Sequence, residues 1–451
     1  MYKQMFNYVW GIITNFDFGP SFRYKDRSVN DIIAQGFPVT LKYGSLAFLF
    51  AVISGVSLGI IAAIRQNTFI DYRLGWGPII LGHADDRINN AVSEAVKKGI
   101  TFAATTELET EVAEKMVSMI PGMEMLRFTN TGTEATMHAL RVARGYTRRE
   151  KFIKFEGQYH GAHDYVLFST ASSPLSGMGS RTAPIPVQVG SGIPNKIRDY
   201  VFSVPFNDFE AVENVVKDHY GDIAAMMIEP CLGNIAGLEP SKGYLAHLRK
   251  LCDKYGIVMI FDEVKTGFRL ANGGAREEYN VIPDISTYAK SLGNGFPVAA
   301  FGGKKDIMSV IGGGSVTHAG TFGANGASMA AAKAVLEVLS SSPVLEGIRN
   351  RGQRLKEGMH QILNAADLKH QMTGHPSMQG FVLTEHPFNE VRDLVHHDEE
   401  MYDKIMTYLY HHGVWPENDA REPWFLCESH TDEIIDETLN KFEDAVKSAK
   451  D

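Results

Sequence analysis

The sequence predicts an α/β protein in which apolar strands alternate with helices around a layered sheet. From about residue 69 onward, short apolar runs bounded by charge or glycine alternate with stretches of helical periodicity. The strand candidates are residues 151–155, 223–229 and 257–262, and the helix candidates include residues 134–146 and 244–255. Ligands of such folds bind at the carboxyl ends of the strands, so functional residues are expected there.

Composition excludes several functional classes. The 451 residues suffice for two or three domains, and the net charge of −9 comes without a dense basic run, so nucleic-acid binding is not expected. Cys231, Cys252 and Cys427 are too few and too widely spaced for a disulfide framework or a zinc site, and no metal is expected. The first twenty residues lack a signal-peptide pattern, and we expect a cytoplasmic protein.

An uncharged apolar run covers residues 43–64, between Lys42 and Arg65. Its 22 residues meet the length of a membrane-spanning helix, roughly 20 residues. The alternative is a helix buried within the protein or at a subunit interface. Because the chain after residue 71 alternates like an α/β enzyme, we predict a helix that packs against protein, and membrane contact is not favoured.

Residues 1–68 carry a separate signal. The stretches F-D-F-G-P-S-F-R-Y-K-D-R and A-A-I-R-Q-N-T resemble the permease subunit of bacterial oligopeptide ABC transporters. The segment is too short to form a transport path, and we interpret it as a fusion, a recombinant junction or an assembly artefact. A membrane transport component is one remote alternative function. A serine hydrolase is another, since Gly55-Val56-Ser57-Leu58-Gly59 matches G-x-S-x-G, but without the strand–turn–helix context of that motif.

Lys290 and Asp262 form the centre of a candidate active site. Asp262 ends an apolar strand in F-D-E-V-K-T-G-F-R, and Lys290 follows 28 positions later in Y-A-K-S-L-G-N-G-F-P. Pyridoxal phosphate requires a lysine amine that holds its aldehyde as a Schiff base, and a carboxylate that keeps its pyridine nitrogen protonated. Either residue alone would be ordinary, but the pair predicts this cofactor.

Three further signals accompany that pair along the chain. They are a Gly-Thr loop at a helix start (Thr131, Gly132, Thr133), a Tyr-His pair after a strand (Tyr159, His160) and a second Gly-Thr loop (Gly320, Thr321). The first suits a phosphate group, because backbone N–H groups and the positive end of the helix dipole point at it. An ordinary threonine N-cap and plain turns are the structural alternatives. The five signals in one order are more specific than any one of them.

In this order the motifs resemble the class III pyridoxal-phosphate aminotransferases, and most closely their glutamate-1-semialdehyde aminomutase-like branch. The resemblance covers about five-sixths of the chain, from residue 69 onward. The matching stretches include D-Y-R-L-G-W-G-P-I-I-L-G-H-A, T-N-T-G-T-E-A-T, F-E-G-Q-Y-H-G, I-E-P-C-L-G-N and G-T-F-G-A-N. The resemblance implies the type I PLP-dependent transferase fold. A large domain with a mostly parallel seven-stranded sheet would occupy residues 69–330, and a smaller α+β domain residues 331–451.

The resemblance also implies a role for each candidate. Lys290 would form the Schiff base and Asp262 would pair with the ring nitrogen. The ring would lie between Val264 and Tyr159, with His160 beside it. The remaining implied positions are the phosphate site (Thr131, Gly132, Thr133), two residues near a strand end (Glu229, Asn234) and the second Gly-Thr loop (Gly320, Thr321). Thr321 would reach the phosphate of the neighbouring subunit, so we expect a homodimer with shared active sites.

The expected reaction is transamination between an amine or amino acid donor and a keto acid or aldehyde acceptor, by a ping-pong mechanism. An intramolecular aminomutase is the alternative. The chain departs from its family where an N-terminal arginine often binds the substrate carboxylate, because no motif supports Arg23 or Arg27 in that role. Lys265 stands where an apolar residue is common in relatives. Arg421 is a carboxylate-binding candidate that we interpret as part of a surface ion pair.

Overall fold

The protein is described by a computed structural model that covers residues 2–20, 27–34, 69–312 and 314–450. The chain divides into two units, Met1–Thr68 and Phe69–Asp451. In the first unit, helix α1 spans Tyr2–Asn15. The apolar run at residues 43–64, the G-x-S-x-G match within it and Arg23 all lie outside the described residues, so the predictions made for them stay predictions. None of the helices in the described ranges combines the length and apolarity of a membrane span.

A mixed sheet forms the centre of the unit Phe69–Asp451. Within the described residues it has seven strands in the order β2-β10-β9-β8-β7-β3-β6. Their bounds are β2 Met125–Thr129, β10 Ala299–Gly303, β9 Ile285–Tyr288, β8 Val258–Asp262, β7 Ile223–Ile228, β3 Lys151–Phe155 and β6 Val201–Val204. Only β10 of these runs against its neighbours, and the others are parallel to one another. The predicted fold class, with a mostly parallel seven-stranded sheet, is confirmed.

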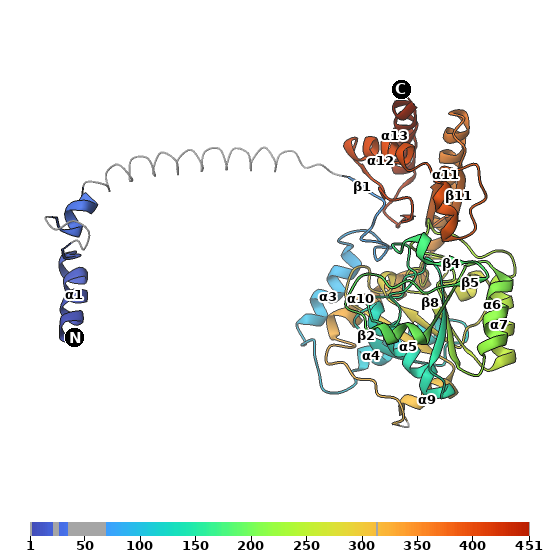
Figure 1. The fold of residues 1–451 in the computed structure, drawn as a ribbon, viewed down its shortest axis with the longest axis horizontal. Helices are drawn as coiled ribbons and strands as arrows, with labels where there is room; N and C mark the ends of the chain where they lie inside the picture. The colour runs from blue at the N-terminus through green and yellow to red at the C-terminus, as the bar shows by residue number, and fades with distance from the viewer. Residues whose placement is uncertain (1, 21–26, 35–68, 313, 451) are drawn as a thin grey trace. The chain divides into compact units, whose positions relative to one another are not determined.

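The central strands are continuous apolar runs because helices cover both faces of the sheet. Along β7, Met226 and Ile228 pack into one buried cluster with residues of α6 (Phe209–His219) and α7 (Tyr244–Tyr255). Ala225 and Met227, which alternate with them, pack on the opposite face with residues of α5. Helix α5 spans Gly132–Thr147. Tyr288 and Ala300, on the same face of the sheet as Met226, pack with residues of α3, α4 and α10. In Figure 1, α6 and α7 lie toward one edge of the sheet and α3, α4 and α10 toward the other.

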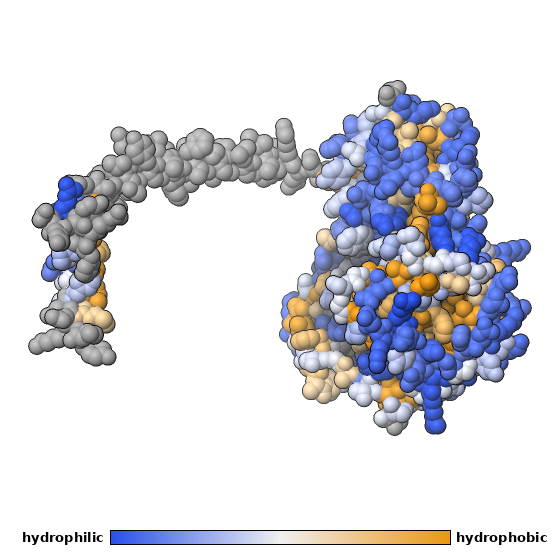
Figure 2. Space-filling view, viewed as in Figure 1, coloured by the Kyte–Doolittle hydropathy of each residue, from blue (hydrophilic) through white to orange (hydrophobic). Residues whose placement is uncertain are grey.

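The remaining helices of this part of the chain complete the layers. Helix α10 packs against both α3 and α4. The bounds are α3 Asp86–Val96, α4 Glu107–Met119, α8 Ala275–Glu278, α9 Lys305–Gly312 and α10 Gly326–Ser341. Short 3-10 helices span Leu175–Gly177 (η1), Asn195–Tyr200 (η2), Lys290–Gly293 (η3) and Val391–His396 (η4), and a small hairpin pairs β4 (Gly179–Ser180) with β5 (Ala183–Pro184). Figure 2 shows hydrophilic residues over much of the visible face of this unit.

The C-terminal part packs three helices around a small antiparallel sheet, and Figure 1 shows these elements together at one end of the unit. Helix α13 contacts both α11 and α12. The bounds are α11 Val344–Ala365, β11 Gln371–His375, β12 Met378–Val382, α12 Glu399–His411, β14 Trp424–Phe425 and α13 Asp432–Lys450. Strand β1 (Ile70–Asp71) pairs with β13 (Val414–Trp415), which ties the segment after residue 69 to this part.

Local predictions hold to within two residues. The strand at residues 151–155 and the helix at residues 244–255 have the predicted bounds. Strand β7 ends at Ile228, one residue before the predicted end, and β8 begins at Val258, one residue after the predicted start. Helix α5 begins at Gly132, because Thr131 acts as its N-cap and its side chain accepts from the backbone N–H of Glu134.

Candidate active site

The ends of three strands and one helix N-terminus converge on a single cavity. Asp262 ends β8, Glu229 follows β7, and Lys290 begins the 3-10 helix after β9. The cavity has a volume of about 150 Å³. Its lining comprises Gly132, Thr133, Thr136, Tyr159, His160, Gly161, Glu229, Asn234, Asp262, Val264, Lys265 and Lys290. Most of the predicted site residues are therefore brought together.

Asp262 is held at both carboxylate oxygens. Its Oδ1 accepts from Thr287 Oγ1 at 2.9 Å and from the backbone N–H of Val264 at 3.1 Å. Its Oδ2 lies 2.8 Å from His160 Nδ1. Burial lowers the pKa of His160, so the ring is neutral and its Nδ1–H donates to the carboxylate. The carboxylate is only 3% exposed and is fixed in orientation at the end of its strand.

Lys290 combines a strained backbone with a weakened affinity for its proton. Its φ is 45°, a left-handed conformation that non-glycine residues rarely adopt. Its Nζ donates to the backbone carbonyl of Trp76 at 2.6 Å. Burial, together with the nearby ammonium of Lys265, lowers the pKa of Lys290 to about 7. A large fraction of this amine is therefore neutral near pH 7, as a nucleophile or a general base must be.

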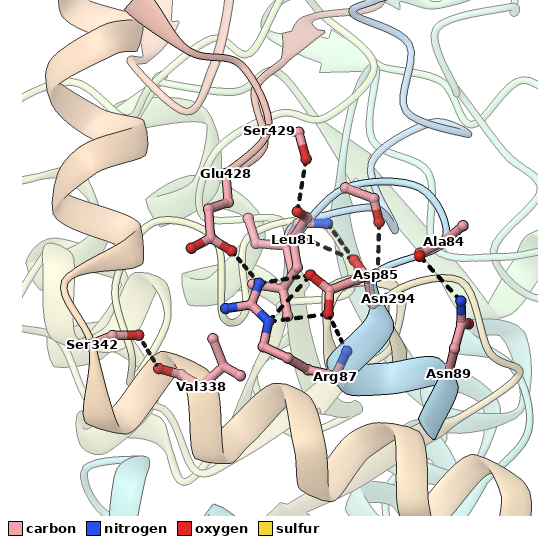
Figure 3. Close-up of polar contacts among 12 residues, drawn as sticks. Leu81, Ala84, Asp85, Arg87, Asn89, Asn294, Val338, Ser342, Glu428 and Ser429 are labelled. Atoms are coloured by element: carbon pink, nitrogen blue, oxygen red, sulfur yellow. Dashed lines mark hydrogen bonds and ion pairs between the residues drawn. The ribbon is translucent and has the colours of Figure 1, made fainter. Parts of the chain in front are cut away.

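The segment that supplies the Trp76 carbonyl is anchored on two sides (Figure 3). Asn294, at the end of the turn that begins with Lys290, accepts from the backbone N–H of Leu81 at 3.0 Å. Ser429 donates to the Leu81 carbonyl at 3.1 Å, and Arg87 binds Glu428. The lysine turn, the chain before α3 and the C-terminal part are thus locked together around the amine.

The helix N-terminus at the cavity provides backbone donors for an anion. Thr131 forms a capping box with Glu134, so the predicted structural alternative, a threonine N-cap, is present. Gly132 and Thr133 begin α5 and line the cavity, and the first backbone N–H groups of a helix have no partner within it, so they can bind an anion there. A Cβ on Gly132 would come 3.0 Å from Val264 Cγ2, which shows how closely the helix start packs against that side chain.

Glu229 organises the loops that face Asp262. Its carboxylate accepts from the backbone N–H of Tyr159 at 2.8 Å and of Gly233 at 3.0 Å. Burial and the neighbouring Asp262 raise the pKa of Glu229 to about 7. Tyr159 is 44% exposed at the cavity wall, and Asn234 donates to Glu422. Tyr159 therefore presents an aromatic ring that a planar ligand could stack on.

Three of the predicted positions are not among the residues that line the cavity. Thr131 is the N-cap next to Gly132. Gly320 and Thr321 are exposed and are not among the residues that line the cavity. The predicted contact of Thr321 with a neighbouring subunit stays a prediction. Arg421 forms a two-pronged ion pair with Asp419, 2.6 Å at its shortest, which agrees with its interpretation as part of a surface pair.

Sequence reasoning did not identify several residues that act in the site. Thr287, which binds Asp262, lies directly across from it in the β8–β9 register and could have been found from P-D-I-S-T-Y-A-K. The Trp76 carbonyl and the Glu422 carboxylate carried no sequence signal, because their proximity to the cavity depends on the tertiary fold. Lys265 was noticed only as a departure from relatives.

The site can therefore hold three chemical groups together. Lys290 offers a neutral amine to a carbonyl group, Asp262 offers a buried carboxylate to a protonated ring nitrogen, and the start of α5 offers backbone donors to an anion. Tyr159, which lines the cavity, is 44% exposed to solvent.

Comparisons with known proteins agree with this arrangement. The family model described as aminotransferase class III matches residues 50–446. A glutamate-1-semialdehyde 2,1-aminomutase from Persephonella marina is 40% identical over 385 residues, which cover 85% of this chain and 88% of the relative. The crystal structure of an omega-transaminase from Sphaerobacter thermophilus superposes with a TM-score of 0.80 at 30% identity, covering 85% of this chain and 87% of its own. A transaminase with PLP bound gives a TM-score of 0.75 at 28% identity, over 84% and 87% of the two chains. The chain belongs to the class III aminotransferases.

Proposed function

We propose that this enzyme is an aminomutase of the glutamate-1-semialdehyde type, which moves an amino group between two carbons of one substrate. From the sequence, transamination was the first expectation and this reaction was the alternative. The order is reversed here, because the relative that is 40% identical over most of the chain bears the aminomutase name. The structural observation that carries amino-group chemistry is the Lys290 amine, with its lowered pKa, in one cavity with the buried Asp262 carboxylate.

The cofactor is pyridoxal 5′-phosphate. When bound, it supplies an aldehyde that reacts with amines and a ring that delocalises the negative charge left on a carbon after proton removal. The residues of the cavity fit it group by group: Lys290 for the aldehyde, Asp262 for the ring nitrogen, and the start of α5 at Gly132 and Thr133 for the phosphate. Val264 and Tyr159 would enclose the ring.

Residues of the chain would move the proton and hold the ring nitrogen protonated. Lys290 takes a proton from the substrate carbon and returns it elsewhere, acting first as base and then as acid. Asp262 keeps the ring nitrogen protonated, and His160 and Thr287 hold its carboxylate in place. In the aminomutase reaction the amino group leaves C2 of the semialdehyde and ends on C1, so C2 becomes a ketone and no atoms are gained or lost.

The remaining expectations are part of the same proposal. We expect a homodimer in which Thr321 reaches the neighbouring active site, and a cytoplasmic location. The exposed position of Thr321 on a single chain is compatible with that contact.

The test is turnover without a keto acceptor. The purified enzyme, loaded with pyridoxal phosphate, is given glutamate 1-semialdehyde alone, and the aminoketone product is counted per active site. An aminomutase makes many products per site. An aminotransferase stops after one turnover and resumes when a keto acid is added, and that result would overturn the proposal.

A further inference from the structure

Lys265 introduces a second positive charge into the active-site cavity. Its side chain is 8% exposed, and its Nζ donates to the Gly233 carbonyl at 2.5 Å and to Glu422 Oε2 at 3.0 Å. An ammonium group has three N–H donors, so these two bonds leave one for another acceptor. Among the described residues that line the cavity, Lys265 and Lys290 are the two with cationic side chains.

The surrounding loop is shaped to accommodate a lysine. A Cβ added to Gly233 would lie 2.1 Å from Cδ of Lys265, so the alkyl chain of the lysine occupies the space that any other residue would fill. The backbone N–H of Gly233 binds Glu229, which fixes the loop in this position. The ammonium also lies 5.6 Å from the centre of the Phe425 ring. The position of Lys265 is therefore defined on several sides.

Glu422 is the counter-ion of Lys265, and another carboxylate could replace it. The glutamate is 19% exposed and is also bound by Asn234, another residue of the cavity lining. A poorly hydrated ion pair adds little net stability, because the loss of hydration offsets the attraction of the charges. Such a pair at the wall of a binding cavity is better explained by binding than by folding.

Two arginines near the site form ion pairs with carboxylates. Arg73 binds Glu417 at 3.0 Å, and Arg421 binds Asp419. Lys290 is required for the reaction itself. Its lowered pKa includes a contribution from Lys265, so the Lys265 ammonium lies within electrostatic reach of the reacting amine. Among the described residues that line the cavity, Lys265 is therefore the cation besides Lys290 that can contact a bound substrate.

We propose that Lys265 binds the carboxylate of the substrate and that Glu422 occupies the same ammonium when no carboxylate is present. The inference rests on the proposed function and extends it to substrate selection: the pocket takes aliphatic amines that bear a carboxylate, as glutamate 1-semialdehyde does. Neutral amines of the same length lack the charge that competes with Glu422.

The test compares two amino donors that differ only at one end, with a keto acid added as the acceptor of the amino group. 4-Aminobutyrate and butylamine have the same chain, with a carboxylate in one and a methyl group in the other. Lys265→Met should raise the KM for 4-aminobutyrate by ~10–100-fold, which corresponds to a lost charged hydrogen bond of about 1.5–3 kcal/mol. The KM for butylamine should stay nearly unchanged, and because Lys265 also lowers the pKa of Lys290, any change in kcat should be the same for both donors. Lys265→Arg should restore part of the loss, and Glu422→Gln should lower the KM for 4-aminobutyrate.

Two controls separate binding from general damage. Lys356→Met removes another partly buried lysine, which donates to the Gly374 carbonyl outside the cavity, and should change neither KM. Calorimetry with pentanoate and pentanamide measures binding without turnover, and only pentanoate should bind more weakly to Lys265→Met.

An equal rise in the KM of both donors would overturn this inference, as would weaker binding of 4-aminobutyrate by Glu422→Gln. A wild-type enzyme that prefers butylamine or accepts neither amine would also overturn it. The proposed function is judged separately, by covalent fixation of the cofactor to Lys290 with borohydride and by turnover of glutamate 1-semialdehyde without an acceptor. An enzyme that passes both tests but shows no carboxylate preference keeps its function and loses the assigned role of Lys265.

Discussion

Replacing Asp262 by asparagine removes one charge and keeps the shape of the side chain. The Oδ1 position accepts from the backbone N–H of Val264 and from Thr287, so the oxygen of the new amide must stay there. Its NH₂ group then faces His160 Nδ1, where the carboxylate was 2.8 Å away. The His160 ring can accept from it by moving its proton to Nε2, which has no partner among the described residues. The site should therefore stay folded.

The expected loss of activity follows from the lost charge. A carboxylate and a protonated ring nitrogen ~4 Å apart attract each other by about 4 kcal/mol at an effective dielectric constant of about 20. Asp262 is 3% exposed, so water screens this attraction weakly. With tenfold in rate for each 1.36 kcal/mol, kcat should fall by ~10³-fold. The amide cannot keep the ring nitrogen protonated, and the carbon that loses its proton is then poorly stabilised.

The assay is single-turnover kinetics with glutamate 1-semialdehyde, with the bound cofactor quantified for each variant. Asp284→Asn is the matched control, because Asp284 is also buried next to the sheet and binds Arg249 and Lys304 outside the cavity. This control should lose stability but keep its kcat. Near wild-type kcat in Asp262→Asn at full cofactor content would refute the reasoning and reduce Asp262 to a structural residue. An equal loss in the control would show that the effect is not specific to the site.

Three further outcomes are expected. Lys290→Ala should lose all turnover, and borohydride treatment followed by peptide mapping should find no cofactor attached to its chain, whereas the wild-type enzyme carries it on Lys290. The cofactor-free enzyme should take up pyridoxal phosphate faster as pH rises through about 7, because only the neutral Lys290 amine attacks the aldehyde. Lys265→Met should move this rise to higher pH, since the removed cation helps to lower the pKa of Lys290. Stopped-flow absorbance measures the uptake, and an unchanged pH dependence in Lys265→Met would contradict the assignment. Thr287→Val should lower the free energy of unfolding by ~1.5–3 kcal/mol in urea titrations, because it leaves the buried Asp262 carboxylate without one donor, and an unchanged midpoint would count against that bond.

The fold was predictable where local pattern and burial agree. Strands β3, β7 and β8 are unbroken apolar runs because both faces of the sheet are covered, and the sequence shows them directly. Strand β10, A-A-F-G-G, has no such signature. It forms because β2 and β9 offer it hydrogen bonds on both edges, and its pairing with β2 brings together segments more than 150 residues apart. The position of β10 in the sheet order therefore required the structure.

The site, like the fold, was predictable only in part. Lys290 and Asp262 could be predicted because the chemistry of one cofactor demands both residue types, and the spacing of motifs along the chain identified them. A pKa of Lys290 lowered by burial is expected for a lysine that acts as a base, but the contribution of Lys265 could not be predicted, since it depends on where the fold places the two side chains. The partner of Lys265 is Glu422, 157 positions away, and only the folded chain brings the two together. The sequence thus indicates the groups proposed to perform the reaction, whereas the proposed substrate selection depends on side chains that meet through tertiary packing. Variants of the Lys265–Glu422 pair test substrate selection separately from the reaction itself.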